Sequence, residues 1–322
     1  MKIGLLFPGY GSQFVGMCKD LYDDSRTIQE YFEEASACLD FNFIKLCFAS
    51  SDVELSQPSQ AYLSLFVVQS AIASLLLKAG IEPSLVGGYG IGQFGALYSA
   101  KGFTFPDGLY ALKKYAQFYE EMLNNLHGAV FQVNGLTFEQ LNKIIVSLKD
   151  CKTLAIAAHN HETEFVVSGE ANEIAKLREI LDKEKKLKFK DVDIAFGFHS
   201  HLMDPVVEQL SLYLGKIDFK DLQIPLTNNY NAKKITKAED VKKIVVSQLF
   251  SPLLWQESIK NFDDVDLLIQ IGPGKDFEKL VRKQYPDKEL LVFAQRADVE
   301  NFKKLFPDTQ LDFKLQIVGE EE

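Results

Sequence analysis

The chain begins with a short hydrophobic run of the kind that forms a buried strand. Residues 3–7 (IGLLF) are apolar or glycine throughout, and Pro8 and Gly9 close the run. A second run, residues 85–89 (LVGGY), follows a long stretch of helical character. Both runs predict strands that end at a glycine-containing turn.

Hydrophobic stretches of helical length separate these strands. Residues 59–79 have the length and apolar content of a helix, with Pro58 where a first helical turn accepts proline and Gly80 where a helix ends. Residues 106–125 form another amphipathic stretch. Strands that alternate with helices indicate an α/β layer fold with a mainly parallel sheet.

The pattern changes between residues 127 and 195. Strand-like and helix-like segments follow one another here in the order β-α-β-β-α-β, which is the ferredoxin-like arrangement. The segments are residues 128–133, 138–148, 153–159, 164–170, 171–184 and 187–194. We therefore expect a compact inserted subdomain.

The insertion divides the remainder of the chain into two pieces. We expect residues 1–126 and 196–318 to form one large α/β-hydrolase-like domain, residues 127–195 to form the subdomain, and residues 319–322 (GEEE) to be a frayed tail. The basic run at 183–190 (KEKKLKFK) is expected to be a solvated helix end.

Composition and charge match an ordinary globular protein and argue against nucleic acid as a partner. Hydrophobic residues make up 47% of the 322 residues and charged residues 25%, which suits one large domain or two modest ones. The net charge is −10 and the isoelectric point about 5.2. Proteins that bind a nucleic-acid backbone usually need a basic surface.

The cysteines and the N-terminus favour a cytoplasmic, soluble protein. Cys18, Cys38, Cys47 and Cys151 show no C-x-x-C spacing, so we expect reduced thiols. The first apolar run is too short for a signal peptide, and no run approaches the roughly 18 apolar residues of a membrane span. We therefore expect no membrane partner.

Short motifs follow one another along nearly the whole chain. In order, they are FPGYGSQ (7–13), SQP (56–58), GYGIGQ (88–93), FHS with LM (198–200 and 202–203), NN (228–229), QLFSP with Trp255 (248–252) and GPGK (272–275). Their order and spacing resemble malonyl-CoA:acyl carrier protein transacylase and the acyltransferase domains of polyketide synthases. This resemblance also implies an inserted ferredoxin-like subdomain.

The resemblance implies a nucleophile elbow, a sharp strand-to-helix turn, at GYGIGQ. In the family, a serine there attacks the acyl-CoA thioester, a histidine accepts its proton, and an arginine binds the malonyl carboxylate. Gly90 stands at the serine position. It offers no oxygen for an ester, and such a loss costs on the order of a million-fold in turnover. Glycine relaxes the strained backbone of an elbow, so the turn can persist without its chemistry.

Other positions of the site also differ from the family pattern. Tyr89 replaces a histidine, and Gln93 replaces a glutamate. Tyr10, between the two glycines of the first motif, replaces a glutamine. Counting 25 residues from Gly90 places Tyr115 at the position of the carboxylate-binding arginine. Together these changes indicate that the whole site is no longer constrained to perform the family's reaction. A single engineered substitution would not explain them.

The resemblance assigns two more kinds of role. The backbone N–H groups of Tyr10 and Ile91 correspond to the donors that stabilise the oxyanion. The former acyl pocket is expected to include Tyr89, Gln93, Tyr115 and Asn160.

His199 falls on the family's catalytic histidine. It is either the old general base, still aimed at the site, or a histidine that packs or hydrogen-bonds there because no serine remains to be deprotonated. Ser12 and Ser200 belong to the family pattern and are not expected to be nucleophiles. His201 is expected to point elsewhere.

His159 and His161 flank Asn160. Histidines two residues apart can share one strand face, but no carboxylate or cysteine completes a metal set beside them. We expect a loop or edge pair, with neither a metal nor another cofactor.

The three tyrosines Tyr10, Tyr89 and Tyr115 replace polar or charged groups around one pocket. Tyrosine has a bulky apolar body and one hydroxyl. We expect the three side chains to fill much of the former acyl pocket, with their hydroxyls bonded to His199 or to one another. The alternative is a pocket reshaped for an uncharged acyl group.

Three functions remain open. The first is a pseudoenzyme of fatty-acid or polyketide biosynthesis that binds an acyl carrier protein or a partner synthase or acyltransferase. The second is an acyl-thioester hydrolase or transferase for a non-malonyl acyl group, in which His199 activates water or a carrier thiol. The third binds acyl-CoA without turnover. Coenzyme A and carrier proteins are anionic, so this acidic chain would need a local basic patch, from the run at 183–190 or from Lys113 and Lys114.

Overall fold

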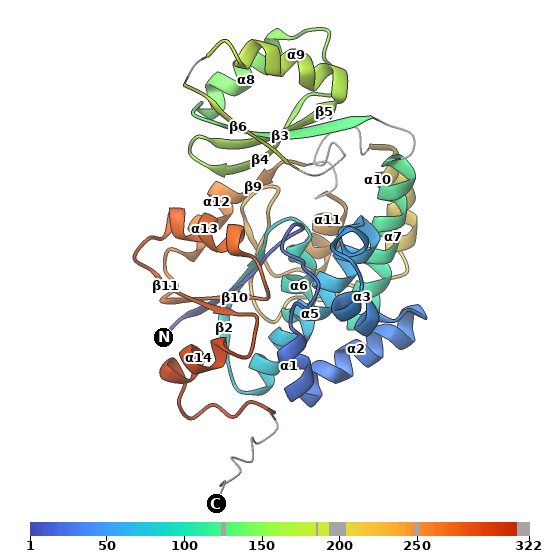
Figure 1. Ribbon diagram of the computed structural model, residues 1–322, viewed down its shortest axis with the longest axis vertical. Coiled ribbons are helices and arrows are strands. Elements are labelled where there is room, and N and C mark those ends of the chain that lie inside the picture. Colours follow the sequence, from blue (N-terminus) through green and yellow to red (C-terminus); the bar gives the residue numbers. More distant parts are fainter. Residues whose placement is uncertain (124–126, 185, 193–203, 248–250, 314–322) are drawn as a thin grey trace, which may run out of the picture.

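The protein folds around two sheets, one in each of two lobes (Figure 1). The computed structural model describes residues 1–123, 127–184, 186–192, 204–247 and 251–313, with the backbone alone at residues 122–123 and 204–206. The strands are β1 (Ile3–Phe7), β2 (Pro83–Gly88), β3 (Gly128–Asn134), β4 (Ala155–His161), β5 (Glu164–Glu170), β6 (Lys188–Asp191), β7 (Leu226–Thr227), β8 (Lys234–Ile235), β9 (Leu253–Leu254), β10 (Leu267–Ile271) and β11 (Glu289–Phe293).

Helices surround both sheets. They are α1 (Lys19–Asp24), α2 (Arg26–Leu39), α3 (Phe43–Ala49), α4 (Asp52–Leu55), α5 (Pro58–Lys78), α6 (Gly92–Ser99), α7 (Phe105–Leu123), α8 (Phe138–Ser147), α9 (Ala171–Leu181), α10 (Asp204–Leu214), α11 (Ala238–Ser247), α12 (Trp255–Ile259), α13 (Lys275–Gln284) and α14 (Asp298–Leu305), with a 3₁₀ turn, η2, at Lys260–Phe262.

The sheet of the large domain is mainly parallel, as the alternation of strands and helices predicted. Its order is β11-β10-β1-β2-β7-β8, and only the pairing of β7 with β8 is antiparallel. Every residue of β1 and of β10 is buried. Helices on both faces of a parallel sheet leave no solvent-facing positions, which explains why these strands are apolar without alternation.

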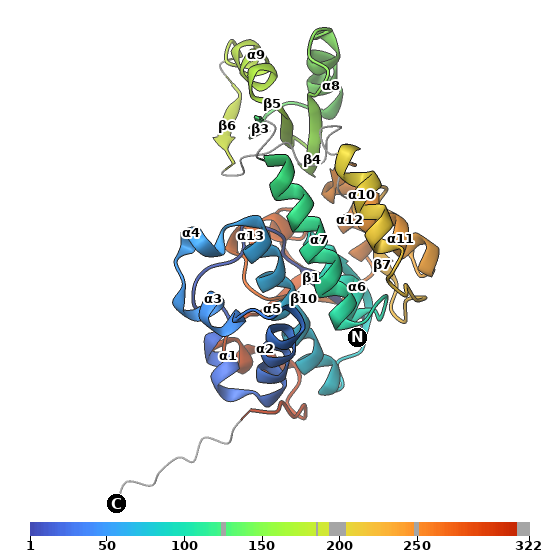
Figure 2. The same cartoon turned by 90° about the vertical axis from the view of Figure 1, so that its right-hand side faces the viewer.

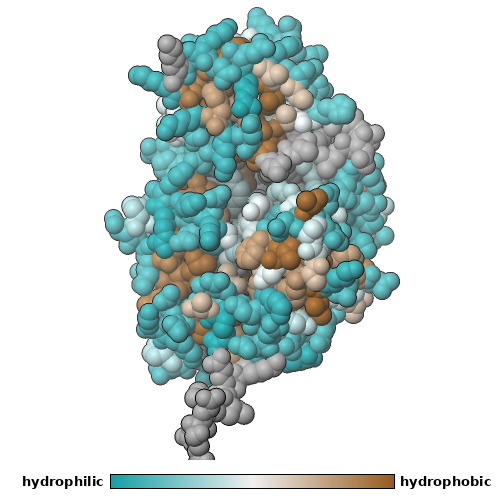
Figure 3. All heavy atoms as spheres, viewed as in Figure 1, coloured by the Kyte–Doolittle hydropathy of each residue, from teal (hydrophilic) through white to brown (hydrophobic). Residues whose placement is uncertain are grey.

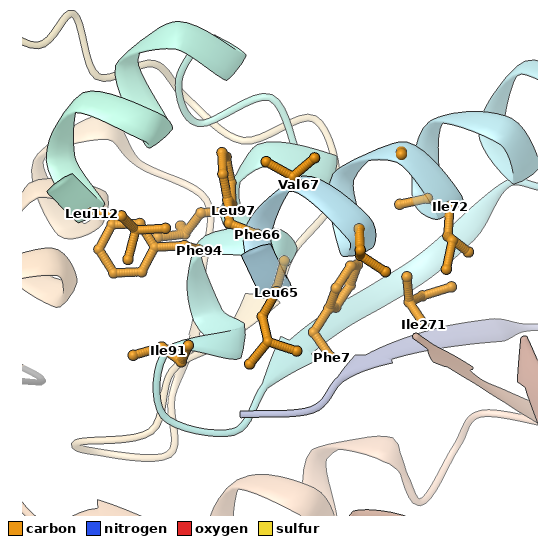
Figure 4. Packing of buried hydrophobic residues seen from close by; sticks show 14 of the residues in the cluster. Phe7, Leu65, Phe66, Val67, Ile72, Ile91, Phe94, Leu97, Leu112 and Ile271 are labelled. Carbon is orange, nitrogen blue, oxygen red and sulfur yellow. The ribbon is translucent and has the colours of Figure 1, made fainter. Parts of the chain in front are cut away.

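Helix α5 crosses the middle of the large domain. It begins at Pro58 and ends at Lys78, one residue from the predicted limits, and Gly80 follows with φ +89°. By length and composition α5 could cross a membrane, but it is largely buried and packs against α2, α6 and α7. Figure 4 shows its apolar side chains between β1 and α6. It is the central core helix of this domain.

Helix α7 runs from the large domain toward the subdomain, beside α10 (Figure 2). It begins at Phe105, one residue before the predicted start. Residues 124–125 of the predicted helix lie outside the described residues. Tyr115 and Tyr119 on α7 are buried, so this helix brings two phenol rings into the interior.

The subdomain has the predicted β-α-β-β-α-β order. Its strands β6, β3, β5 and β4 lie side by side in that order and are antiparallel to their neighbours. Helices α8 and α9 cover the face of the sheet that is turned away from the large domain (Figures 1 and 2). The other face is therefore available to close over the large domain.

A fifth strand, which the sequence did not predict, joins the two lobes. The two-residue strand β9, which follows α11, pairs in parallel with β4 through Ala158 and His159. The basic run at 183–190 also differs from expectation. Helix α9 ends at Leu181, and Lys188 and Lys190 belong to β6, where Lys190 lies 3.8 Å from Asp276 of α13. The run is not a helix end because the chain has already turned into the edge strand.

The proposed domain limits are only partly visible in the structure. Residues 126 and 195–196, where the boundaries were placed, and the tail at 319–322 lie outside the described residues. All four cysteines are described and unbridged: Cys18 and Cys47 are buried, Cys38 is exposed and Cys151 is partly buried. Figure 3 shows that hydrophilic residues cover most of one face, with apolar residues in smaller patches.

Candidate active site

The turn between β2 and α6, residues 88–92, has the geometry of a nucleophile elbow. Gly90 has φ +53°, in the left-handed region that favours glycine. A Cβ atom on Gly88 would lie 2.1 Å from the backbone carbon of Gly92, and one on Gly92 would lie 2.2 Å from the oxygen of Phe7. These two glycines are required by close backbone contact, so strand and helix meet as tightly as an elbow needs.

Gly90 itself is not required by lack of space. A Cβ atom at this position would meet only the Cδ1 atom of Leu253, at the ordinary contact distance of 3.6 Å. The backbone conformation is the remaining cost of a larger residue, about 1 kcal/mol for a left-handed φ. The elbow could therefore carry a serine, so packing does not demand a glycine at this position.

Two buried amides hold the elbow from behind. The side chain of Gln93 accepts a hydrogen bond from the N–H of Gly88 (3.0 Å) and donates one to the oxygen of Thr227 (3.1 Å). Asn229 donates to the oxygen of Gly88 (2.6 Å) and accepts from the N–H of Gly90 (3.3 Å). The elbow is thereby tied to β7 and to the loop that follows it.

This placement corrects the predicted role of Gln93. The resemblance predicted Gln93 in the acyl pocket, but its side chain is fully buried between β2 and β7 and does not line the cavity described below. It lies in the first turn of α6 and points back toward the sheet. The role of Asn229 was missed, although the pair of asparagines was visible as a motif.

A cavity of about 90 Å³ lies beside Gly90, between the two lobes. This volume is far below the roughly 300–1,000 Å³ of typical ligand pockets. The lining is mostly apolar and consists of Tyr10, Tyr62, Tyr89, Gly90, Ile91, Tyr115, Val130, Ala157, Ala158, Val166 and Leu253. The large domain supplies the tyrosine rings, and the subdomain supplies small apolar side chains from β3, β4 and β5.

The tyrosines at positions 10, 89 and 115 all lie around this cavity. The ring of Tyr89 packs edge-on against Trp255, with ring centres 5.5 Å apart, and its hydroxyl donates to the Oδ1 atom of Asn160 (2.8 Å). Asn160 thus holds Tyr89 and does not itself line the cavity, contrary to expectation. Among the described residues, the hydroxyl of Tyr89 bonds to Asn160 and not to another tyrosine, and His199 lies outside those residues.

Tyr62, on α5, is a fourth tyrosine that the sequence analysis missed. Its ring meets those of Tyr10 and Tyr115 edge-on, with centres 5.7 and 5.8 Å apart. Tyr10 donates its hydroxyl hydrogen to the oxygen of Ser56 (2.7 Å). The hydroxyl of Tyr62 is buried and has no hydrogen-bond partner among the described residues. No sequence signal could have singled out Tyr62, because it lies within a helical stretch that is apolar along most of its length.

The buried phenols are neutral hydrogen-bond donors. Burial raises the pKa of Tyr62 well above its ordinary value, and the neighbouring hydroxyls of Tyr119, Tyr115 and Tyr10 raise it further. Burial also raises the pKa values of Tyr89 and Tyr115. The cavity wall therefore carries no phenolate charge at neutral pH.

Both positions expected to supply oxyanion donors border the cavity. Ile91 lies directly before α6 and lines the cavity. The first N–H groups of a helix have no partner within that helix. Tyr10 lines the cavity from the loop after β1. Ser12 donates its hydroxyl hydrogen to the oxygen of Gly9 in this loop, which fits the expected role in turn structure. His199, Ser200 and His201 lie outside the described residues.

His159 has a carboxylate partner that the sequence did not reveal. It lies on β4, and its Nδ1 atom is 2.7 Å from the Oε1 atom of Glu257 on α12. The expected loop or edge pair needs correction, because β9 pairs with β4 at this residue and covers that edge. Partial burial by itself would raise the pKa of Glu257, but the hydrogen bond and charge of the His159 ring lower it overall. Among the described residues, no three His, Cys, Asp or Glu side chains gather as a metal site would need.

Comparisons with known proteins agree with this geometry. The family model "Acyl transferase domain" matches residues 5–291. The chain is 31% identical to the malonyl CoA-acyl carrier protein transacylase of Bacillus subtilis (strain 168), over 88% of this chain and 90% of that protein. A crystal structure of an acyl carrier protein S-malonyltransferase from Vibrio cholerae superposes with a TM-score of 0.89 at 25% identity, covering 94% of this chain and all of that one. The transacylase of Clostridium perfringens gives a TM-score of 0.89 at 26% identity, covering 95% and 98%.

Proposed function

The chain belongs to the malonyl-CoA:acyl carrier protein transacylase family. We propose that it acts in fatty-acid or polyketide biosynthesis without forming an acyl-serine. The observation that carries this proposal is Gly90, at the apex of a well-formed elbow. A ping-pong acyl transfer needs an oxygen or sulfur nucleophile at this apex. Glycine supplies neither.

The lining of the cavity supports the same conclusion. Malonyl transfer requires a cation for the substrate carboxylate, and no lysine, arginine or histidine is among the described residues that line the cavity. Tyr115 occupies the position that the resemblance assigns to the arginine, and it is 2% exposed. The loss of the nucleophile is therefore accompanied by a wall unsuited to malonate.

We propose that the remaining function is binding. The relatives are named for an acyl carrier protein, and this chain keeps their overall architecture over most of its length. A carrier protein, or a synthase or acyltransferase that works with one, is the partner that this reasoning favours. The cytoplasm is the compartment in which we place it.

A second candidate function retains chemistry without a serine. It is favoured by the backbone at Tyr10 and Ile91, which still borders the cavity and could stabilise an oxyanion. In this candidate His199 would activate water or a carrier thiol against a bound non-malonyl thioester. Loss of acyl-CoA hydrolysis in His199→Ala would support it, whereas no turnover of any acyl-CoA by the unaltered protein would eliminate it.

The proposed function is tested with radiolabelled malonyl-CoA and the variant Gly90→Ser. The unaltered protein should acquire no covalent label. Gly90→Ser should fold, at a cost of about 1 kcal/mol in the free energy of unfolding, yet transfer no malonyl group, because the described cavity lining offers no cation for the carboxylate.

Gly90→Ala is the matched control, since it carries the same backbone cost without a hydroxyl. Stoichiometric label on the unaltered protein would refute the loss of acyl-enzyme chemistry. Efficient malonyl transfer by Gly90→Ser would show that the interpretation of Tyr115 is wrong.

A further inference from the structure

We infer that the cavity beside Gly90 binds a short, uncharged acyl group without reacting with it, and that the Tyr62 hydroxyl donates a hydrogen bond to the acyl carbonyl. This inference rests on the proposed function, and it names the ligand class and a residue that selects it. It concerns recognition alone, so no bond forms or breaks.

The described part of the cavity wall disfavours a charged acyl group. The lining combines tyrosine rings with valine, alanine, leucine and isoleucine side chains, and its described residues include no cation. A carboxylate moved here from water would lose hydration without gaining an ionic partner from the described lining, which costs several kcal/mol. A neutral acyl group meets no such penalty.

The size of the cavity restricts the length of that group. At about 90 Å³, it offers much less space than a typical small-molecule pocket. The subdomain closes it with Val130 and Val166, whose side chains come from β3 and β5. An acetyl or propionyl group suits this space better than a long chain.

Tyr62 provides the polar feature that a thioester could use. Its side chain is fully buried and lines the cavity, and its hydroxyl has no partner among the described residues. A buried donor without an acceptor costs about 1–3 kcal/mol. A carbonyl oxygen only accepts hydrogen bonds, so it complements this hydroxyl and restores the lost interaction.

The other cavity tyrosines with a defined hydroxyl bond are less suited to this role. The hydroxyl of Tyr89 is directed to Asn160, and that of Tyr10 to Ser56. Tyr62 is also held on three sides by the rings of Tyr10, Tyr115 and Tyr119. Its hydroxyl is therefore fixed in position before a ligand arrives, which reduces the entropy lost on binding.

The experiment is calorimetric titration of the full chain with acetyl-CoA, malonyl-CoA and coenzyme A alone. Acetyl-CoA should bind more tightly than coenzyme A, and malonyl-CoA should bind no more tightly than coenzyme A. Tyr62→Phe should weaken acetyl-CoA binding about five- to tenfold, the value of one hydrogen bond, and leave coenzyme A binding unchanged. Tyr22→Phe, on α1 and outside the cavity lining, is the matched control and should alter neither.

A second measurement separates a binding role from a packing role. Tyr62→Phe removes a hydroxyl that has no partner, so the melting temperature without ligand should rise, by roughly 2 °C. Ala157→Leu fills the cavity from β4 and should abolish the preference for acetyl-CoA while Tyr62 is intact. A stable Tyr62→Phe variant with undiminished acetyl-CoA preference would overturn the role of Tyr62.

Two results distinguish this inference from the proposed function. Equal affinity for acetyl-CoA and coenzyme A would mean that the cavity holds only water, and the inference would fail while the proposed function stood. Covalent labelling by acetyl-CoA, with the preference intact, would refute the proposed function and leave the cavity's selectivity for a neutral acyl group in place.

Discussion

The elbow and the cavity wall that faces it are built by different means. The elbow is fixed by backbone contact, since neither Gly88 nor Gly92 has room for a Cβ atom. The wall is fixed by side chains, namely four tyrosine rings from the large domain and small apolar residues from the subdomain. The backbone of such a turn is therefore specified separately from the side chains that surround it.

Hydrogen bonding shows the same contrast. The donors and acceptors of the elbow are paired through Gln93 and Asn229, with four bonds to residues 88, 90 and 227. The wall contains the hydroxyl of Tyr62, which has no partner among the described residues. Hydrogen-bonded amides such as these resist change, whereas an unpaired donor leaves an opening for a ligand.

The largest expected effect tests the backbone of the elbow. Gly88→Ala places a Cβ atom 2.1 Å from the backbone of Gly92, so strand and helix must separate. We expect a loss of at least about 4 kcal/mol in the free energy of unfolding, or failure to fold. Gly90→Ala, with open space and only a left-handed φ, should lose about 1 kcal/mol. Urea denaturation measures both, and equal losses would contradict the difference in packing.

A smaller effect is expected from the amides behind the elbow. Gln93→Leu leaves the N–H of Gly88 and the oxygen of Thr227 buried without their partner. We expect a loss of about 3 kcal/mol by denaturant unfolding. The exposed Gln117 on α7 provides the control, because Gln117→Leu should change stability by less than about 0.5 kcal/mol. A Gln93→Leu variant as stable as the control would show that the two hydrogen bonds of Gln93 do not stabilise the elbow.

The smallest effect concerns the contact between the elbow and the subdomain. Tyr89→Phe keeps the ring packing against Trp255 and removes the hydrogen bond to Asn160. We expect a loss of about 1 kcal/mol, measured by thermal and denaturant unfolding. Tyr22→Phe serves again as the control. If Tyr89→Phe is neutral or stabilising, the bond to Asn160 does not help to join the two lobes.

Much of the fold could be predicted because its signals are local. The apolar run of β1, the proline and glycine at the ends of α5, and the β-α-β-β-α-β order of the subdomain depend on neighbouring residues and their spacing. The glycine at position 90 was also evident from the sequence, because a residue that differs from a known motif can be identified without a structure. The elbow needed only a strand, a glycine-rich turn and a helix in succession.

The rest of the site depends on contacts between residues far apart in the chain. Tyr62 becomes notable only when α7 and the first loop bring other rings around it, and Gln93 supports the elbow only because β7 lies behind it. The two residues of β9 are too few to show a period, and the partner of His159 is 98 residues away. The sequence by itself determined the succession of elements and the glycine at the apex of the elbow, because both depend on adjacent residues. The tertiary structure alone decided which buried hydroxyl lacks a partner and how much space remains beside Gly90, because burial and volume arise only when distant segments pack together.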